Sequence, residues 1–374
     1  MKNYVKYKFL ALTKQPFSLL VCLGLLILTN LLMIFSTSAV TGLQSFDDSY
    51  YFIRRNMIFL SIGIVVFFIG YFISISFIRK YTLFIVLFAL FLLLLCLSPL
   101  GVTIGGASRW LNLVVIRFQP VEFVKLSLIL FCANYLDLKK HKLSNFFSGT
   151  FPLVCVFSLV CLLLLLQPDL GNTALILLFF LSILFLSPLP ISHFLLLIFS
   201  ALSLLITSII LNPYQRDRVL TFLSPDLDPF GKGYHISQSL LSIGSGGAWG
   251  LGLGQSKLKF FYLPLQYSDF IFSIIGEEGG FLFSSFIVLI FLFIAIKSIG
   301  FAVKASSTFN AYCILGLMLF LVFQAFINIS AVLALIPVTG IPLTFISFGG
   351  TSLISSLFSF GLLLNLISLD KKHD

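Results

Sequence analysis

A single carboxylate in the second half of the chain has a sequence setting that suits proton transfer. Asp269 stands in YSDFIFSIIGEEGG, between Ser268 and the apolar run FIF. This setting removes part of the water around the carboxyl group, and desolvation raises the pKa of a carboxyl. A raised pKa suits a general base that works near neutral pH. The alternative is a helix cap at Ser268 or Asp269, since both residue types are common before an apolar helical run.

Two further acids follow on the same apolar stretch. Glu277 and Glu278 come eight and nine residues after Asp269. Ionisable groups inside a membrane span are costly and usually face a partner or a wet cavity. Asp269 and Glu277 are about two helical turns apart and would roughly share a face. A paired-carboxylate site is therefore one possibility, in which only one of the pair need be catalytic.

Basic residues before this stretch could bind an anion. Arg109 lies in GGASRWL, and Arg216 and Arg218 lie in YQRDRV. Lys125 follows Glu122 by three residues, a spacing that suits an ion pair. Guanidinium groups near a bilayer suit a pyrophosphate or a phospholipid headgroup, because they pair with oxyanions bidentately. Simple anchoring to lipid headgroups is the alternative for each of these residues.

The elements that must position these residues are membrane helices. The chain has 374 residues, of which 59% are hydrophobic and 10% charged, whereas a soluble domain is about 45–50% apolar and about 25% charged. Its apolar runs are long and unbroken rather than alternating, which favours helices over a barrel. We predict an all-α polytopic membrane protein, a single integral membrane domain over residues 1–374. The ten expected spans are about 17–36, 57–77, 81–99, 121–137, 150–166, 173–188, 191–211, 271–296, 308–334 and 351–369.

The short loops predict the orientation. More than half of the Lys and Arg residues fall on the side of the two termini, so we expect both termini in the cytoplasm. The first span is longer than the apolar core of a signal peptide and is expected to be retained. The large loop 212–270, between spans seven and eight, then lies outside. The outer loop 337–350 is dense in Pro and Gly and apolar enough to dip into the protein. An anionic substrate is the simplest explanation for the basic residues on the outer side.

Other chemistries find little support. The His and Cys residues are scattered and form no CxxC pair, which argues against a zinc site and a disulfide framework. The glycine run at 243–254 lacks the preceding strand of a dinucleotide fingerprint, so tight turns and close backbone approach are the better interpretation. Asp169 in QPDLGN could cap the sixth helix. We expect no organic cofactor and no nucleic-acid partner.

Several ordered blocks together resemble the SEDS family, the shape, elongation, division and sporulation proteins that include FtsW, RodA and SpoVE. The resemblance covers nearly the whole chain. Its blocks are GGASRWL at 105–111, RFQPVEFVK at 117–125, QPDLG at 167–171, YQRDRVLTFLSPDLDPFGKGYHISQSLLSIGSGG at 214–247, GLGQSKLKFFYLP at 252–264, SDFIFSIIGEEGG at 268–280 and PVTGIPLTFISFGGTSL at 337–353.

The resemblance implies a ten-helix peptidoglycan glycosyltransferase that polymerises lipid II on the outer face of a bacterial cytoplasmic membrane. The family's essential aspartate falls on Asp269, as general base on the acceptor hydroxyl with undecaprenyl pyrophosphate leaving. Basic side chains, with or without a divalent cation such as Mg²⁺ or Mn²⁺, would stabilise the pyrophosphate. The substrate-binding candidates are Arg109, Lys125, Arg216 and Arg218, and the supporting candidates are Glu122, Ser268, Glu277 and Glu278.

The chain departs from the family pattern at two places. The Glu and His that commonly precede the aspartate are missing, and Phe348 and Thr344 stand where Tyr and Pro are usual. These differences concern local tuning or activation by a partner. Most blocks resemble the division branch, FtsW, while YQRDRV and GYHISQS lean toward the elongation branch, RodA. The expected partners are lipid II, membrane lipid and a class B penicillin-binding protein.

Two other functions compete with this hypothesis. A lipid II flippase would use similar spans, but it should carry charged residues along a path through the bilayer, and several predicted spans have few or none. A scaffold that only recruits the transpeptidase would not need Asp269. Septal glycan synthesis is therefore the favoured function, with an elongation polymerase as its nearest alternative.

Overall fold

The computed structural model describes residues 17–104, 107–112, 117–225, 233–257, 259 and 266–370. Helices dominate this part of the chain. They are α2 (Phe17–Phe46), α3 (Tyr51–Phe72), α4 (Ile75–Cys96), α5 (Pro120–Lys139), α6 (Phe151–Leu166), α7 (Leu170–Phe185), α8 (Ile191–Leu211), α9 (Pro213–Leu223), α10 (Tyr234–Ser245), α11 (Ile271–Val303), α12 (Thr308–Val332) and α13 (Gly350–Asp370), with short helical turns at Lys140–Lys142 and Phe146–Thr150.

All ten predicted spans overlap helices, α2 to α8 and α11 to α13, which confirms the all-α membrane fold, although α3 and α4 each begin six residues before the predicted span. In the described part of the chain, eight helices are long and apolar enough to cross a membrane. The other two predicted spans are α7, which is shorter, and α5, which carries several charged residues. The first span was predicted too short, because α2 continues to Phe46. The terminal residues 1–16 and 371–374, and with them the predicted cytoplasmic termini, lie outside the described residues.

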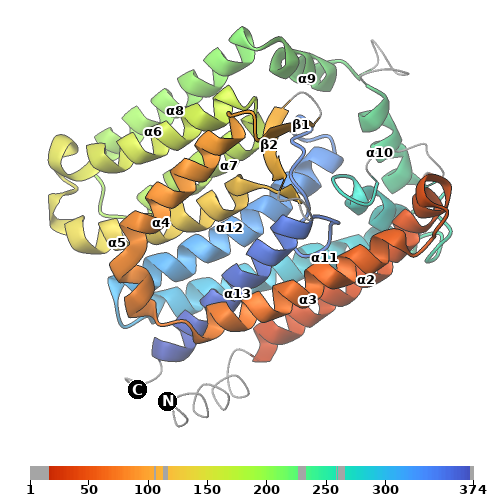
Figure 1. Cartoon of the computed structure of the whole chain (residues 1–374), viewed down its shortest axis with the longest axis horizontal. Helices are drawn as coiled ribbons and strands as arrows, with labels where there is room; N and C mark the ends of the chain where they lie inside the picture. Colours follow the sequence, from red (N-terminus) through yellow and green to blue (C-terminus); the bar gives the residue numbers. More distant parts are fainter. Residues whose placement is uncertain are drawn as a thin grey trace.

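The helices form one bundle (Figure 1). α12 and α13 are its most buried spans, whereas Leu197 is the one buried residue of α8. An apolar helix with so little buried surface faces lipid on most sides. α2 begins and α13 ends toward the same end of the bundle, while the strands, α9 and α10 lie toward the other (Figure 1). The site residues are therefore carried by one end of the bundle.

A small antiparallel sheet joins α4 to α5, where the sequence predicted only a loop. Its strands are β1 (Gly101–Ile104), β2 (Ala107–Asn112) and β3 (Arg117–Phe118), in the order β1-β2-β3. The register slips between Val102 and Thr103, so Val102 pairs with Trp110 and Thr103 with Ser108. Such a bulge re-aims neighbouring side chains. Arg109 stands on β2 at this slip.

The predicted large loop 212–270 is partly helical. α9 begins with Pro213 after Asn212, whose side chain accepts a hydrogen bond from the backbone N–H of Tyr214 at 3.1 Å. This is a standard helix start, with Pro in the first turn and Asn as the cap. α10 follows after residues outside the described set. α9 places Arg216 and Arg218 on a regular element rather than on an open loop.

The segment 337–349 runs without regular helix, and much of it is buried. Two side-chain amides of α12 donate hydrogen bonds to backbone carbonyls of this segment. Asn328 donates to the oxygen of Ile341 at 2.8 Å, and Gln324 donates to that of Pro342 at 3.3 Å. Irregular backbone at membrane depth needs such protein partners, because lipid offers none. The prediction that this outer loop dips into the protein agrees with the structure.

α11 is broken near its start. Gly280 has φ 67° and ψ −171°, values outside the helical region. The glycine run lies against this break, and a side chain at Gly250 would place its Cβ 2.2 Å from the carbonyl oxygen of Glu278. Only glycine permits this approach. The close backbone contact predicted for the run is confirmed.

Candidate active site

Asp269 lies two residues before α11 and is partly exposed. Its Oδ1 accepts a hydrogen bond from the hydroxyl of Ser268 at 2.9 Å. Its backbone carbonyl accepts from the amide of Asn328 at 2.7 Å, and the carbonyl of Ser268 accepts from the hydroxyl of Ser347 at 2.7 Å. The backbone that carries the carboxyl group is thus fixed to α12 and to the segment 337–349.

The capping alternative for these residues is wrong. The residue before the first helical position of α11 is Phe270, and no side chain caps the helix there. Capping does occur at α7, where Oδ1 of Asp169 accepts from the backbone N–H of Asn172 at 3.2 Å, as the sequence predicted. The carboxyl group of Asp269 is therefore not occupied by a helix terminus.

Two guanidinium groups approach the carboxyl group of Asp269 from different elements. Arg109 extends from β2 and Arg218 from α9, and the positive charge of each acts on Asp269. A Cβ at Gly340 would lie 3.7 Å from Oδ2 of Asp269 and 3.9 Å from Nη1 of Arg109. Gly340 therefore lies beside both groups, and its missing side chain leaves space next to the acid and the cation.

Each of the two arginines is also held in place by residues other than Asp269. Arg109 donates to the carbonyl of Pro168 at 2.8 Å, and its Nε lies 3.6 Å from Oδ2 of Asp169. Arg218 donates to the carbonyl of Val338 at 3.2 Å, and its guanidinium carbon lies 4.7 Å from the centre of the Tyr214 ring. Fixed guanidinium groups are preorganised to stabilise an anion.

The electrostatics of Asp269 are set by opposing effects. Burial raises the pKa of this carboxyl above its ordinary value, while the hydroxyl of Ser268 and the charges of Arg218 and Arg109 act to lower it. Desolvation is the largest of these effects, so the net direction is upward. A carboxylate with a raised pKa is a stronger base once ionised, as the sequence argument required.

Glu277 and Glu278 have a different environment. Oε2 of Glu277 accepts from the hydroxyls of Ser242 at 3.1 Å and Ser256 at 2.5 Å, and Oε1 accepts from the backbone N–H of Lys257 at 2.8 Å. Oε1 of Glu278 accepts from Ser36 at 2.7 Å, and Nζ of Lys259 lies 3.3 Å from it. None of these contacts involves Asp269. The two acids thus bind residues that flank the glycine run, and Glu278 also binds Ser36 of α2. The structure does not pair either acid with Asp269.

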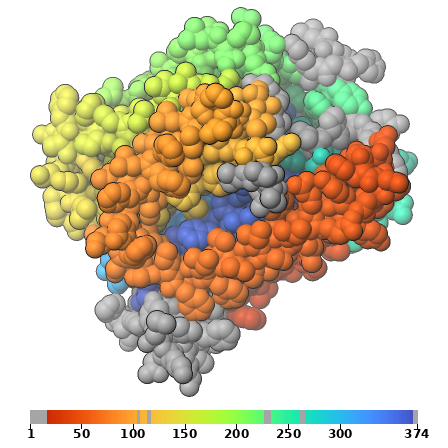
Figure 2. All heavy atoms as spheres, in the orientation of Figure 1, coloured from red at the N-terminus to blue at the C-terminus, as the bar shows by residue number. Residues whose placement is uncertain are grey.

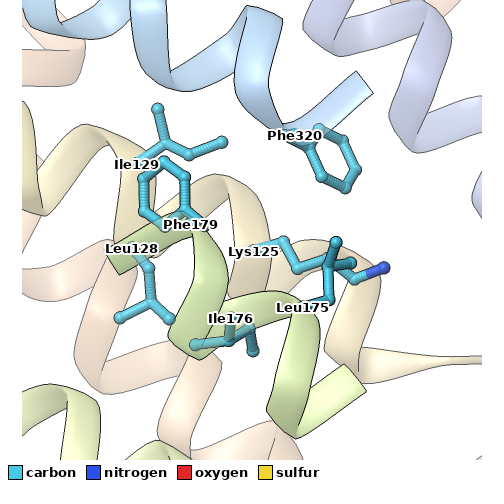
Figure 3. A pocket seen from close by; sticks show the side chains of 7 residues that line it. All are labelled: Lys125, Leu128, Ile129, Leu175, Ile176, Phe179 and Phe320. Carbon is cyan, nitrogen blue, oxygen red and sulfur yellow. The ribbon is translucent and has the colours of Figure 1, made fainter. Parts of the chain in front are cut away.

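Glu122 and Lys125 form the ion pair expected from their spacing, with 2.8 Å between Nζ and Oε1. Lys125 is 4% exposed and also donates to Gln324 at 3.0 Å. The cavity beside it has about 10 Å³, among apolar side chains (Figure 3), which is room for no more than one water. Lys125 does not join the Asp269 cluster directly. It reaches the segment 337–349 through Gln324.

Arg216 is exposed on α9. It stands two positions before Arg218, and residues two apart on a helix do not face the same side. The structure therefore brings Arg109 and Arg218 to Asp269 and leaves Arg216 and Lys125 at other places.

Sequence reasoning missed several residues of the site. Gln324 and Asn328 lie one helical turn apart in an otherwise apolar span, and this spacing of two amides was a usable signal. His235 of α10 stacks on Phe270 with 6.0 Å between ring centres, and burial lowers the pKa of its imidazole. Within the described ranges, no three His, Cys, Asp or Glu side chains come together to hold a metal ion, and the divalent cation stays a prediction.

Two hollows accompany the site. A pocket of about 280 Å³ lies between α7, α8, α9 and the segment 336–339, with Arg218 and Thr339 in its wall. An apolar groove of about 450 Å³ lies between α3, α4, α5 and α13, with Glu122 in its lining. Figure 2 shows the hollow between α3 and α4 with α13 at its floor. Both could hold an apolar chain.

Comparisons with known proteins agree over nearly the full length. The sequence profile of the FtsW/RodA/SpoVE family, described as cell cycle proteins, matches residues 17–372. Stage V sporulation protein E of Bacillus subtilis (strain 168) is 36% identical over 354 residues, covering 94% of this chain and 97% of the relative. The probable peptidoglycan glycosyltransferase FtsW of Geobacter sp. (strain M18) is 35% identical over 355 residues, with the same coverage.

Solved structures give the same result. A chain from a peptidoglycan synthase complex, described as coordinating polymerization and crosslinking, superposes with a TM-score of 0.75 at 28% identity, covering 94% of this chain and 98% of that one. The rod shape determining protein RodA of Thermus thermophilus superposes with a TM-score of 0.70 at 25% identity, covering 95% and 97%. The chain therefore belongs to the FtsW/RodA/SpoVE family of polytopic bacterial membrane proteins, the family that its sequence blocks resemble.

Proposed function

We propose that this protein polymerises lipid II into glycan strands on the outer face of the cytoplasmic membrane, with Asp269 as the general base. Its class, a peptidoglycan glycosyltransferase, follows from its relatives named FtsW and from its structural neighbour in a peptidoglycan synthase complex. The single observation that supports the assignment to Asp269 is the setting of its carboxyl group, whose pKa is raised by burial and on which the charges of Arg109 and Arg218 both act.

The proposed step is a displacement at the anomeric carbon of one sugar. The acceptor hydroxyl gives its proton to a carboxylate oxygen of Asp269, and its oxygen forms the new bond to the anomeric carbon. The bond from that carbon to the pyrophosphate oxygen breaks, and its electron pair leaves with the pyrophosphate. Arg109 and Arg218 stabilise the negative charge that gathers on the leaving group. A divalent cation, if one binds, would share that task.

The hollows suit the remainder of such a substrate. A lipid-linked pyrophosphate has a long apolar chain and a compact anionic head. The pocket of about 280 Å³ has apolar walls and meets the Arg218 guanidinium at one side. It can hold the first units of a chain while the head reaches the arginine. The apolar groove over α13 could hold the chain of a second lipid-linked molecule.

The biological role is proposed on the same basis. The relatives named FtsW favour septal synthesis. The structural neighbour from a complex of polymerization and crosslinking supports a class B penicillin-binding protein as partner. The distribution of Lys and Arg in the loops favours both termini in the cytoplasm. The nearest alternative is that the protein is a RodA-like polymerase of cell elongation. Depletion of the protein in its own host separates the two roles. Loss of septa with continued elongation supports division, whereas rounding of the cells supports elongation.

Polymerisation of labelled lipid II by purified protein in vesicles, with and without its transpeptidase partner, tests the activity. Asp269→Asn should lose polymer while keeping its fold. Asp47→Asn is the matched control, because Asp47 is exposed at φ 54° and Asn tolerates that backbone. Equal polymer from the Asp269 variant and the wild type would contradict the role of this residue. Lipid II flipping without polymer would favour a transporter.

A further inference from the structure

The larger part of the glycine run, residues 246–254 (hereafter the run), presents exposed apolar side chains. Trp249 is 83% exposed and Leu253 62%, and Leu241 of α10 beside the run is also exposed. No Asp, Glu, Lys or Arg occurs from residue 240 to residue 256. Large apolar side chains gathered on one surface mark a contact with protein or membrane rather than with water.

Several backbone groups of the run are paired with α11. Leu251 and Gly252 donate to the carbonyls of Glu277 at 2.9 Å and Glu278 at 3.0 Å. Gly247 accepts from the N–H of Phe281 at 2.9 Å. Backbone groups left without a helical partner at the break in α11 are thus paired with backbone groups of the run. Pairing these groups lowers the cost of bringing the loop into an apolar medium, because fewer polar backbone groups are left to water.

The break in α11 separates a part buried in protein from a long part with exposed apolar side chains. Residues 271–278, before Gly280, are all buried in protein. Directly after it, Phe281 is 69% exposed, and further exposed apolar residues follow along the helix. The part after the break has 23 residues, from 281 to 303. At 1.5 Å per residue it is about 34 Å long, enough to cross a hydrocarbon core of about 30 Å alone.

The run lies at the end of the exposed apolar part of α11, where that part would leave the hydrocarbon core. Its contacts are to residues 277–282, at the top of the lipid-facing part of α11. Its apolar side chains continue the lipid-facing surface of that helix. Trp is the residue type enriched at this level of a membrane protein. Lys257, the first charged residue after the run, is exposed, as a side chain at the headgroup level would be.

We propose that the segment 246–254 is a membrane anchor, with Trp249 and Leu253 among the upper acyl chains of the outer leaflet. The first part of α11, about nine residues or about 13 Å, connects this anchor to the segment that carries Asp269. The depth of the anchor then sets the height of Asp269 above the hydrocarbon core. The proposal concerns membrane contact and does not depend on the catalytic assignment.

Tryptophan fluorescence tests this contact, because the chain has two Trp residues. The Trp110→Phe variant, full-length and reconstituted in phosphatidylcholine vesicles, reports Trp249 alone. In lipid brominated near the headgroup end of the acyl chains, we expect its emission to fall by about half, with weaker quenching by bromine at the chain end. The difference between wild type and Trp249→Phe gives the same signal if the first variant does not fold.

Two results would overturn the proposal. Quenching of Trp249 by aqueous acrylamide, with no effect of brominated lipid, would place the run in water. Protection from both quenchers would mean that another protein surface covers it, either a second copy or a partner.

Discussion

A substitution at Asn328 can separate the effect of site geometry on activity from the effect of lost stability. Its amide nitrogen donates to the carbonyl of Asp269 at 2.7 Å and to that of Ile341 at 2.8 Å, and the residue is 2% exposed. Asn328→Leu keeps the approximate size and removes both donors. Two lost hydrogen bonds of about 1 kcal/mol each predict a stability loss of about 2 kcal/mol. The backbone of Asp269 would also lose its attachment to α12.

The chain supplies a matched control at the other end of the bundle. Asn365 of α13 donates to the carbonyls of Gly70 at 3.0 Å and Ile73 at 2.8 Å, and it is also buried. It stands fifteen residues after Gly350, about 22 Å along the helix. Asn365→Leu should therefore cost about as much stability as Asn328→Leu, without touching Asp269.

The assay compares the two variants in thermal unfolding and in lipid II polymerisation. We expect similar shifts in Tm, and a further loss of kcat of about tenfold or more for Asn328→Leu alone, because a displaced general base loses its alignment. KM should change less than kcat, since the arginines stay in place. Equal losses of polymerisation in the two variants at equal Tm would refute the reasoning, because the effect would then be one of stability.

Two further outcomes follow from the same geometry. A general base must be ionised to act, so the polymerisation rate should fall as the pH drops through the raised pKa of Asp269. Arg218→Gln should shift this fall in rate to higher pH, because the variant removes a charge that lowers the pKa of Asp269. A pH–rate profile checks this with the exposed Arg55→Gln as control, and an unchanged profile would contradict the interaction of Arg218 with Asp269. Glu277→Leu should lower Tm more than Glu277→Gln, because Leu leaves the donors of Ser256 and Lys257 unpaired while Gln keeps one acceptor oxygen. Thermal unfolding of the two variants checks this, and equal Tm values would count against this role of Glu277.

The sequence was sufficient for the spans and for the setting of Asp269. Long apolar runs have few other structures available in lipid, so all ten predicted spans overlap helices. The ion pair of Glu122 and Lys125 was predictable because it is local, three residues apart on one helix. The cap at Asp169 was predictable for the same reason.

Contacts between distant segments could not be predicted in this way. The charges of Arg109 and Arg216 look alike in sequence, yet β2 brings Arg109 toward Asp269 while α9 leaves Arg216 exposed. The side-chain partners of Glu277 flank the glycine run, at least 20 residues earlier in the chain, so its spacing from Asp269 was misleading. The sheet that carries Arg109 was missed because its short strands lie in a loop rich in glycine, which is a poor strand signal.

The two places where the sequence departs from the family pattern contact each other in the structure, through Tyr267 and Phe348. Tyr267, two residues before Asp269, packs against Phe348 with 5.8 Å between ring centres. The backbone N–H of Phe348 also donates to the carbonyl of Tyr267 at 2.9 Å. Both rings pack on Phe52 of α3. Aromatic packing therefore ties the segment before Asp269 to the segment 337–349 in this chain, and Asp269 keeps its position without the Glu and His that the family pattern commonly has there.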